Sequence, residues 1–174
     1  MLWRFAPMAD PLVEEWHSRD LDSRITPREL AAVQDWQSSG HTYHIMRDNR
    51  HHVATILGGC FGMNDNHKNQ KSHFEAMLDF VKFQWSKGLD QAALNKVLWP
   101  HASQDMVAHD SYLCRHFPSE FNRPWVTQRI SGPNFSEPDE LNFVGSNGGK
   151  ISLSNHGACP VECRPTEHKD WLLC

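Results

Sequence analysis

The chain of 174 residues is long enough for one domain with a buried core, and 39% of its residues are apolar, as in ordinary globular proteins. Its net charge of −4, with histidine counted as neutral, argues against a general nucleic-acid binder. No apolar run is long enough to span a membrane, and the start of the chain does not form a signal-peptide pattern, because Pro7, Asp10 and Pro11 come too early.

The first segment predicts extended structure around one turn. Trp3 to Phe5 is typical of a strand, and Asp10-Pro11 predicts a turn because proline keeps the preceding residue out of the helical region. Residues 12–16 allow either a strand or a helical turn. We expect a second extended segment here that ends at Asp20 and Asp22. Because a strand opens the chain without any preceding element, we expect a fragment of a longer domain.

A helix is predicted directly after the acidic pair. Thr26 can cap it, Pro27 suits its first turn, Glu29 completes a capping box and Gly40 is a suitable stop. Between these ends, apolar residues recur at helical spacing: Leu30, Val33 and Trp36. The N-terminus of this helix would point back toward the acidic pair, where its free N–H groups favour an anion.

The next segment predicts a strand over residues 42–46, a polar loop over 47–52 and a short apolar run over 53–57. The polar loop contains Arg47, Asp48, His51 and His52, which either contact a ligand or lie in solvent; we favour solvent for the two histidines. Residues 58–62 predict a glycine loop, which permits close approach of the backbone to a ligand or only a tight bend.

Helices dominate the middle of the chain. One amphipathic helix is predicted to end near Gly88, with an apolar stripe formed by Phe74, Met77, Leu78, Val81 and Trp85. A second begins at Leu89 with Asp90 as its cap and ends before Pro100. Residues 106–109 predict a strand, and the chain from Arg123 onward predicts irregular structure with short strands at most. Alternating strands and helices favour an α/β fold with a partly parallel sheet, which binds ligands beyond the carboxyl ends of its strands.

The chemistry of the chain is concentrated at Asp20 and Asp22. Two nearby carboxylates offer the oxygen ligands that Mg²⁺ or Mn²⁺ prefer, and these ions also accept phosphate oxygens. Arg19 and Arg24 flank the pair, so that the site suits a pyrophosphate. The alternative is an exposed turn, with Asp22 or Ser23 capping the next helix and the arginines as ordinary surface charges.

Five cysteines leave two structures open for the C-terminal end. Cys159, Cys163, His168 and Cys174 offer a tetrahedral zinc site, although the spacing is looser than in paired Cys-x2-Cys knuckles. Two disulfides that use four of the five cysteines are favoured, and they fit a lumenal or secreted protein.

Several segments together resemble a glycosyltransferase of the GT-A type. They are Ser18-Arg-Asp-Leu-Asp-Ser-Arg24, His44-Ile-Met-Arg-Asp48, Ile56-Leu-Gly-Gly59, Leu89-Asp-Gln-Ala-Ala-Leu-Asn95 and Ala108-His-Asp-Ser111. The resemblance covers roughly residues 3–145. It implies a partial GT-A, Rossmann-like mixed sheet flanked by helices over residues 1–145, truncated at its N-terminus, and an irregular cysteine-containing tail over 146–174.

The resemblance also implies roles for individual residues. Asp20 and Asp22 match the Asp-x-Asp motif that holds Mn²⁺ or Mg²⁺, with His109 as a further metal ligand. Asp90 and Gln91 would line the reacting sugar, by similarity to the glycogenin-like Asp-Gln-x-x-Leu-Asn segment. The donor's diphosphate would be bound by the three arginines and two glycines of the loops: Arg19, Arg24, Arg47, Gly58 and Gly59.

The activity implied by the resemblance is transfer of a sugar from a nucleotide-sugar donor to a hydroxyl acceptor on a glycan or protein. It implies the lumen of the Golgi or the endoplasmic reticulum as the location. The alternative that we keep from a different class is a non-catalytic binding module, either transferase-like or stabilised by zinc.

Overall fold

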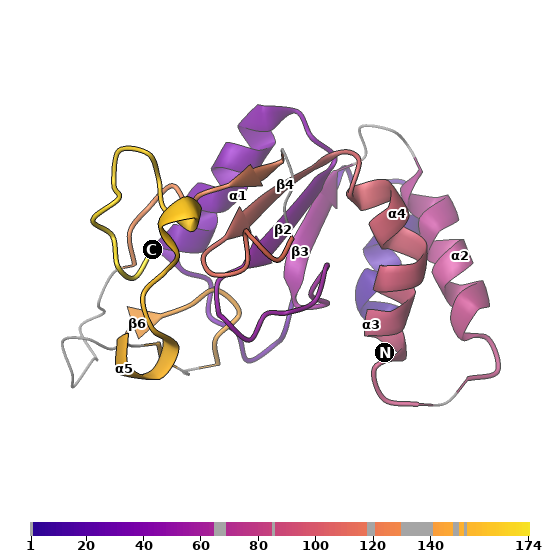
Figure 1. The fold of residues 1–174 in the computed structure, drawn as a ribbon. Helices are drawn as coiled ribbons and strands as arrows, with labels where there is room; N and C mark the ends of the chain where they lie inside the picture. The colour runs from indigo at the N-terminus through magenta and orange to yellow at the C-terminus, as the bar shows by residue number, and fades with distance from the viewer. Residues whose placement is uncertain are drawn as a thin grey trace.

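The computed structural model describes residues 2–64, 69–84, 86–117, 121–129, 141–147, 150–151 and 153–174. Its centre is a five-stranded mixed sheet with helices packed around it (Figure 1). The strand order is β1-β3-β2-β4-β5, in which β2, β4 and β5 are parallel and β3 pairs antiparallel with both β1 and β2. The strands are β1 (Glu15–Arg19), β2 (Tyr43–Arg47), β3 (Cys60–Asn64), β4 (Met106–Asp110) and β5 (Asn122–Arg123). The predicted α/β class with a mixed sheet is confirmed.

The two faces of the sheet pack against different helices. One face lies on η1 (Leu2–Ala9), α2 (Gln70–Val81) and a helical stretch composed of α3 (Leu89–Ala93), η2 (Leu94–Leu98) and α4 (Trp99–Ala102). Alternate strand residues such as Ile45, Phe61 and Ala108 are buried in this larger core. The other face, which carries Met46 and Cys60, packs under α1 (Pro27–Ser39) and against Trp125 and Val144. Side chains therefore alternate between two cores, as the period of a β-strand requires.

Helix α1 begins and ends where the sequence predicts. Thr26 Oγ1 accepts a hydrogen bond from the N–H of Glu29 at 3.2 Å, Pro27 occupies the first turn, and Gly40 closes the helix with φ of 76°. Only half of the predicted capping box forms, because the Glu29 carboxylate binds the guanidinium of Arg19 on β1. This contact joins the start of α1 to the strand that precedes the acidic pair.

The predicted strand at Trp3 to Phe5 is wrong, since these residues lie in the 3-10 helix η1. Leu2, Phe5 and Met8 are buried while Trp3 is exposed. A 3-10 helix has three residues per turn, so residues spaced by three share one face. The apolar spacing of this segment matches that period and not the period of two that a strand needs.

The helices of the middle region differ from prediction at their ends. Helix α2 ends at Val81, before Gly88, and Trp85 lies outside the described residues. Gly88, with φ of 84°, precedes α3, so Asp90 lies in the first turn and does not cap the helix. Pro100 lies within α4. Proline has no N–H to donate and crowds the preceding turn, and the π-helical segment η2 directly before α4 fits that disturbance of the hydrogen-bond pattern.

The C-terminal region contains short elements held by disulfides. They are β6 (Leu141–Asn142), β7 (Lys150–Ile151), α5 (Leu153–His156) and η3 (Val161–Cys163). Cys114 is bonded to Cys163 and Cys159 to Cys174, which confirms the favoured prediction of two disulfides and leaves none of the three C-terminal cysteines as a thiolate for the alternative zinc site. Strand β6 pairs with β7 across the predicted boundary at residue 146, and that boundary stays a prediction. In the part of the chain that the structure describes, no helix has the length and apolarity to cross a membrane.

Candidate functional site

Asp20 lies at the end of β1, where the prediction places it, and faces a glycine. The antiparallel register pairs Arg19 with Cys60, so the next position brings Asp20 opposite Gly59. A Cβ at Gly59 would lie 2.5 Å from Asp20 Oδ2 and 2.8 Å from its Cγ. The Asp20 side chain is 49% exposed. Because Gly59 has no side chain, the Asp20 carboxylate can lie beside it at the surface.

Arg4 is the basic partner of Asp20. Its Nη2 donates to Asp20 Oδ1 at 2.7 Å, and its Nη1 lies 3.3 Å from where a Cβ on Gly58 would be. Among the described residues, the buried Arg4 Nε has no hydrogen-bond partner. Sequence analysis did not single out Arg4, because it lies on η1 and no motif spacing links it to the acidic pair.

The Asp-Gln-x-x-Leu-Asn segment holds the glycine turn in position. Gln91 Oε1 accepts from the N–H of Gly58 at 3.3 Å, and Gln91 Nε2 donates to the carbonyl of Ile56. One turn later Asn95 Oδ1 accepts from Thr55 Oγ1 at 2.8 Å. Spacing of four residues places both amides on one side of the helix, beside residues 55–58. Gln91 thus positions the backbone opposite Asp20, and the structure brings these predicted residues together.

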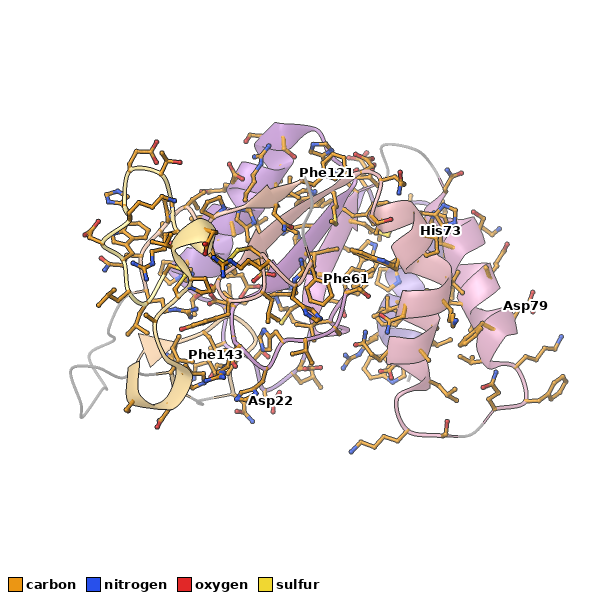
Figure 2. All side chains as sticks on the ribbon, viewed as in Figure 1. Asp22, Phe61, His73, Asp79, Phe121 and Phe143 are labelled. Atoms are coloured by element: carbon orange, nitrogen blue, oxygen red, sulfur yellow. A yellow bond between two sulfur atoms is a disulfide. The ribbon has the colours of Figure 1, made fainter. Side chains whose placement is uncertain are left out.

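Asp22 contacts a different partner from Asp20. A backbone hydrogen bond from Ser23 N to the carbonyl of Asp20 closes a turn at 3.0 Å, and Asn147 Nδ2 donates to Asp22 Oδ2 at 3.3 Å. Figure 2 shows Asp22 near the segment that carries Phe143. Both carboxylates are exposed. Over the described residues no three side chains of His, Cys, Asp or Glu are grouped as a metal site.

The predicted diphosphate-binding arginines differ in their placement. Arg19 donates to Glu29 and to the carbonyl of Ser18, and Arg47 is fully buried, where its Nε donates to Asp110 Oδ2 at 2.7 Å. Arg24 lies exposed beyond the turn, with its backbone N–H bonded to the carbonyl of Ser146 at 3.3 Å. Arg19 and Arg47 therefore form ion pairs with Glu29 and Asp110 inside the protein. Arg4, and neither of these two arginines, is the partner of Asp20.

His109, the predicted third metal ligand, lies in a buried cluster under α1. Its Nδ1 is 2.9 Å from His44 Nε2, its Nε2 is 3.3 Å from Asp35 Oδ2, and its ring lies 5.4 Å from that of Trp125. Burial lowers the pKa of His109 and of His44, and in His44 the neighbouring His109 lowers it further. Both ring nitrogens already have neighbours in the core, so we leave His109 out of the proposed metal site.

The remaining predicted residues have simpler surroundings. Asp90 is partly buried in the first turn of α3, next to Gln91. His52 is not solvated as favoured from the sequence: its Nδ1 accepts from the N–H of Asp48 at 3.2 Å, and burial lowers its pKa to about 4. His51 is exposed.

Asp48 is the centre of a buried ionic network that the sequence did not reveal. It accepts hydrogen bonds from Arg28, Arg129, the Ser111 hydroxyl and the N–H of Val144. Burial alone would raise the pKa of Asp48, but the charges of Arg129 and Arg28 outweigh it and hold the pKa below its ordinary value. The partners come from distant parts of the chain, so no local pattern could have identified them.

Comparison with known proteins found no matching family model, no matching curated protein and no matching solved structure.

Proposed function

We propose that this protein is a divalent-metal-dependent glycosyltransferase that moves a sugar from a nucleotide-sugar donor to a hydroxyl acceptor. The supporting observation is the meeting of Asp20, the Gly58-Gly59 turn and Gln91 with the guanidinium of Arg4. Three segments on which the sequence resemblance depends thus adjoin one exposed carboxylate. An accessible acid beside a guanidinium with unused donors suits a diphosphate group better than a neutral ligand.

The donor set fits a hard cation. Asp20 and Asp22 would hold Mn²⁺ or Mg²⁺, since both carboxylates are exposed and Mg²⁺ is commonly bound by one or two carboxylates together with waters and phosphate oxygens. When bound, the cation would act as a Lewis acid that stabilises the leaving diphosphate.

The residues of the chain would orient the donor and the acceptor. Arg4 would donate to phosphate oxygens, because a guanidinium has five N–H donors and, among the described residues, a single hydrogen bond to Asp20 uses them. Gln91 would act as a positioning residue through the glycine turn. Asp90 is our candidate base for the acceptor hydroxyl, since it adjoins Gln91 at the start of α3.

We further propose that the protein works in the lumen of the secretory pathway. Its two disulfides are compatible with an oxidising secretory or extracellular environment.

Thermal unfolding with metal and diphosphate tests the proposed site. We expect Mn²⁺ with UDP, GDP or inorganic pyrophosphate to raise the melting temperature, because a ligand at about 100 times its Kd stabilises the folded state by about 2.7 kcal/mol. The double variant Asp20→Asn, Asp22→Asn should abolish the rise. Arg4→Gln should weaken the response to the diphosphate while leaving or increasing the response to Mn²⁺ alone, because it releases Asp20.

The matched control is Glu14→Gln, Asp79→Asn, which removes two exposed acids elsewhere; Asp79 lies on α2, away from the acidic pair (Figure 2). This control should respond like the unmodified protein. The proposal fails if none of the three diphosphates acts with Mn²⁺, or if the rise survives in the double variant. A protein that folds but shows neither response would belong to the class of non-catalytic binding modules.

A further inference from the structure

A cleft of about 460 Å³ lies apart from the residues of the Asp20 site. One wall is formed by Arg123 of β5, by Trp125 and Val126 directly after that strand, and by Asp35 of α1. A second part of the lining belongs to the C-terminal segment, with Glu167, His168 and Trp171. The volume falls in the range of small-molecule sites, which combine apolar walls with a few polar groups.

The C-terminal wall is held rigidly by its own loop. The Cys159–Cys174 disulfide closes it, and Arg164 donates to the carbonyl of Cys159 from Nε at 2.9 Å and Nη2 at 2.6 Å. Arg164 Nη1 donates to the carbonyl of Lys169, while Lys169 Nζ donates to the carbonyls of Val161 and Arg164. Because these bonds fix the backbone before any ligand arrives, binding costs less conformational entropy.

Two aromatic rings of the C-terminal segment contribute to the lining of the cleft. His168 stacks on Trp171 with ring centroids 4.2 Å apart and planes 8° apart. Trp125 also lines the cleft but is fully buried, with the guanidinium carbon of Arg28 4.3 Å from its ring centroid, so it supports the cleft without offering a ring face to a ligand. Flat aromatic surfaces with a polar handle suit ligands that carry both C–H faces and hydroxyl groups.

The charges of the cleft are largely paired within the protein. Arg123 Nη1 binds Asp35 Oδ2 at 2.8 Å, and the same oxygen lies 3.3 Å from His109 Nε2. The hydrogen bond with His109 lowers the pKa of Asp35 to about 2, although burial opposes this shift, and Arg123 lowers it further. The ionised pair offers hydrogen-bonding edges without strong net charge, and Glu167 adds one carboxylate. Among the described residues that line the cleft there is no unpaired cation to offset the repulsion between an anionic ligand and that carboxylate.

We propose that this cleft binds an uncharged saccharide of one or two sugar units. The C–H face of a sugar ring would pack on the wall formed by Trp171 and Val126, while its hydroxyls would hydrogen-bond to Glu167 and to the Arg123–Asp35 pair. A proline-rich peptide would use the aromatic rings but not these polar edges, so the saccharide accounts for more of the cleft. The inference does not rest on the proposed transferase activity.

Saturation-transfer NMR with the whole chain tests this proposal. The probes are lactose, N,N′-diacetylchitobiose and mannobiose, with a proline-rich decapeptide as the competing class. We expect transfer to at least one disaccharide, with at least tenfold weaker binding in Trp171→Ala and a smaller loss in Trp171→Phe, which keeps an aromatic ring. Leu172→Ala is the matched control, since Leu172 is exposed in the same loop and does not line the cleft; it should bind normally.

The proposal is overturned if no disaccharide shows transfer, if Trp171→Ala and Trp171→Phe both bind like the unmodified chain, or if only the peptide binds. Far-UV circular dichroism checks whether each variant is folded. If Trp171→Ala does not fold, the affinity of Trp171→Phe for the disaccharide decides the test. The Asp20→Asn, Asp22→Asn variant should retain saccharide binding. That result separates failure of this cleft from failure of the metal site.

Discussion

Single residues in the sheet explain why several histidines are kept neutral. Gly62 pairs with His17 of β1 and with His44 of β2, and a Cβ at Gly62 would lie 2.5 Å from the His17 ring. The glycine therefore lets the two imidazoles approach each other at 5.8 Å between centroids. Burial, with a smaller contribution from the charge of Arg19, lowers the pKa of His17 to about 4.

These neutral histidines predict a loss of stability in mild acid. An unfolded histidine binds a proton near pH 6.5, whereas folded His17 resists protonation until about pH 4. The contribution of neutral His17 to the free energy of unfolding is therefore fully present above pH 6.5. It is lost as the pH drops toward 4, and the loss is about 2 kcal/mol at pH 5. We expect the melting temperature to fall between pH 7 and pH 5, and His17→Gln to make the fall shallower.

The control for this measurement is His116→Gln, a change at an exposed histidine. It should leave the slope of melting temperature against pH unchanged. An unchanged slope in His17→Gln would show that buried His17 does not cause the acid sensitivity. Glu15 lies 3.8 Å from His17, and its charge favours the protonated form of His17, whereas burial disfavours it. The change in slope in His17→Gln therefore reports the balance between these two contributions.

At the scale of elements, the segment from Cys159 to Cys174 is a loop closed by one disulfide and joined to Cys114 by a second, at Cys163. The closing disulfide spans 15 residues in sequence, and loss of such a constraint on the unfolded chain is worth about 3 kcal/mol. We expect Cys159→Ala, Cys174→Ala to increase hydrogen exchange and protease cleavage within this loop while the sheet stays protected. Alanine is preferred to serine because both positions are fully buried.

Cys60→Ala is the control for the loop, because Cys60 is the buried cysteine without a disulfide. It should leave the protection of the loop unchanged. If the double variant exchanges and is cleaved like the unmodified protein, the Cys114–Cys163 disulfide and the hydrogen bonds of Arg164 and Lys169 suffice to hold the loop, and the Cys159–Cys174 disulfide contributes nothing to its order.

The helical stretch from α3 to α4 shows how one element serves both the core and the site. Leu94 and Leu98 are buried in the larger core, while Gln91 and Asn95 bind residues 55–58. The Asp-Gln-x-x-Leu-Asn pattern thus has a structural explanation for three of its residues. Only Asp90 is left with a proposed part in the chemistry.

At the scale of the whole molecule, the Asp48 network joins the sheet, α1 and the C-terminal region. Asp48 follows β2, Arg28 belongs to α1, and Arg129 donates to Asp48 from both terminal nitrogens at 2.9 and 2.7 Å. The hydroxyl of Ser111 binds Asp48 and also lies 3.3 Å from the carbonyl of Cys174. A single carboxylate therefore forms ion pairs with two buried guanidiniums at the junction of these parts.

Removal of this carboxylate should be strongly destabilising. Asp48→Ala leaves two buried arginines without compensation, and breaking a buried ionic contact in this way costs about 3–5 kcal/mol. Urea denaturation measures the loss, with Asp79→Ala as the control on the exposed face of α2. A loss below about 1 kcal/mol in Asp48→Ala would mean that water or other groups replace the carboxylate.

The sequence by itself determined the features that depend on neighbours along the chain. The cap and stop of α1 follow from Thr26 and Gly40, the alternation of elements predicts the α/β class, and the placement of Asp20 at a strand end was predicted correctly. The 3-10 helix at the start was missed because the strand prediction relied on Trp3 and Phe5, which are two residues apart, whereas the buried residues Leu2, Phe5 and Met8 are spaced by three.

Only the tertiary structure decided which distant groups meet. Strand register brings Gly59 to Asp20 and Gly62 between two histidines, and packing selects Arg4 rather than Arg19 or Arg47 as the partner of the acid. It also decides that His109 and Asp48 lie in the interior. Register and burial arise from contacts between residues far apart in sequence, and such contacts leave no local periodicity from which a single sequence can reveal them.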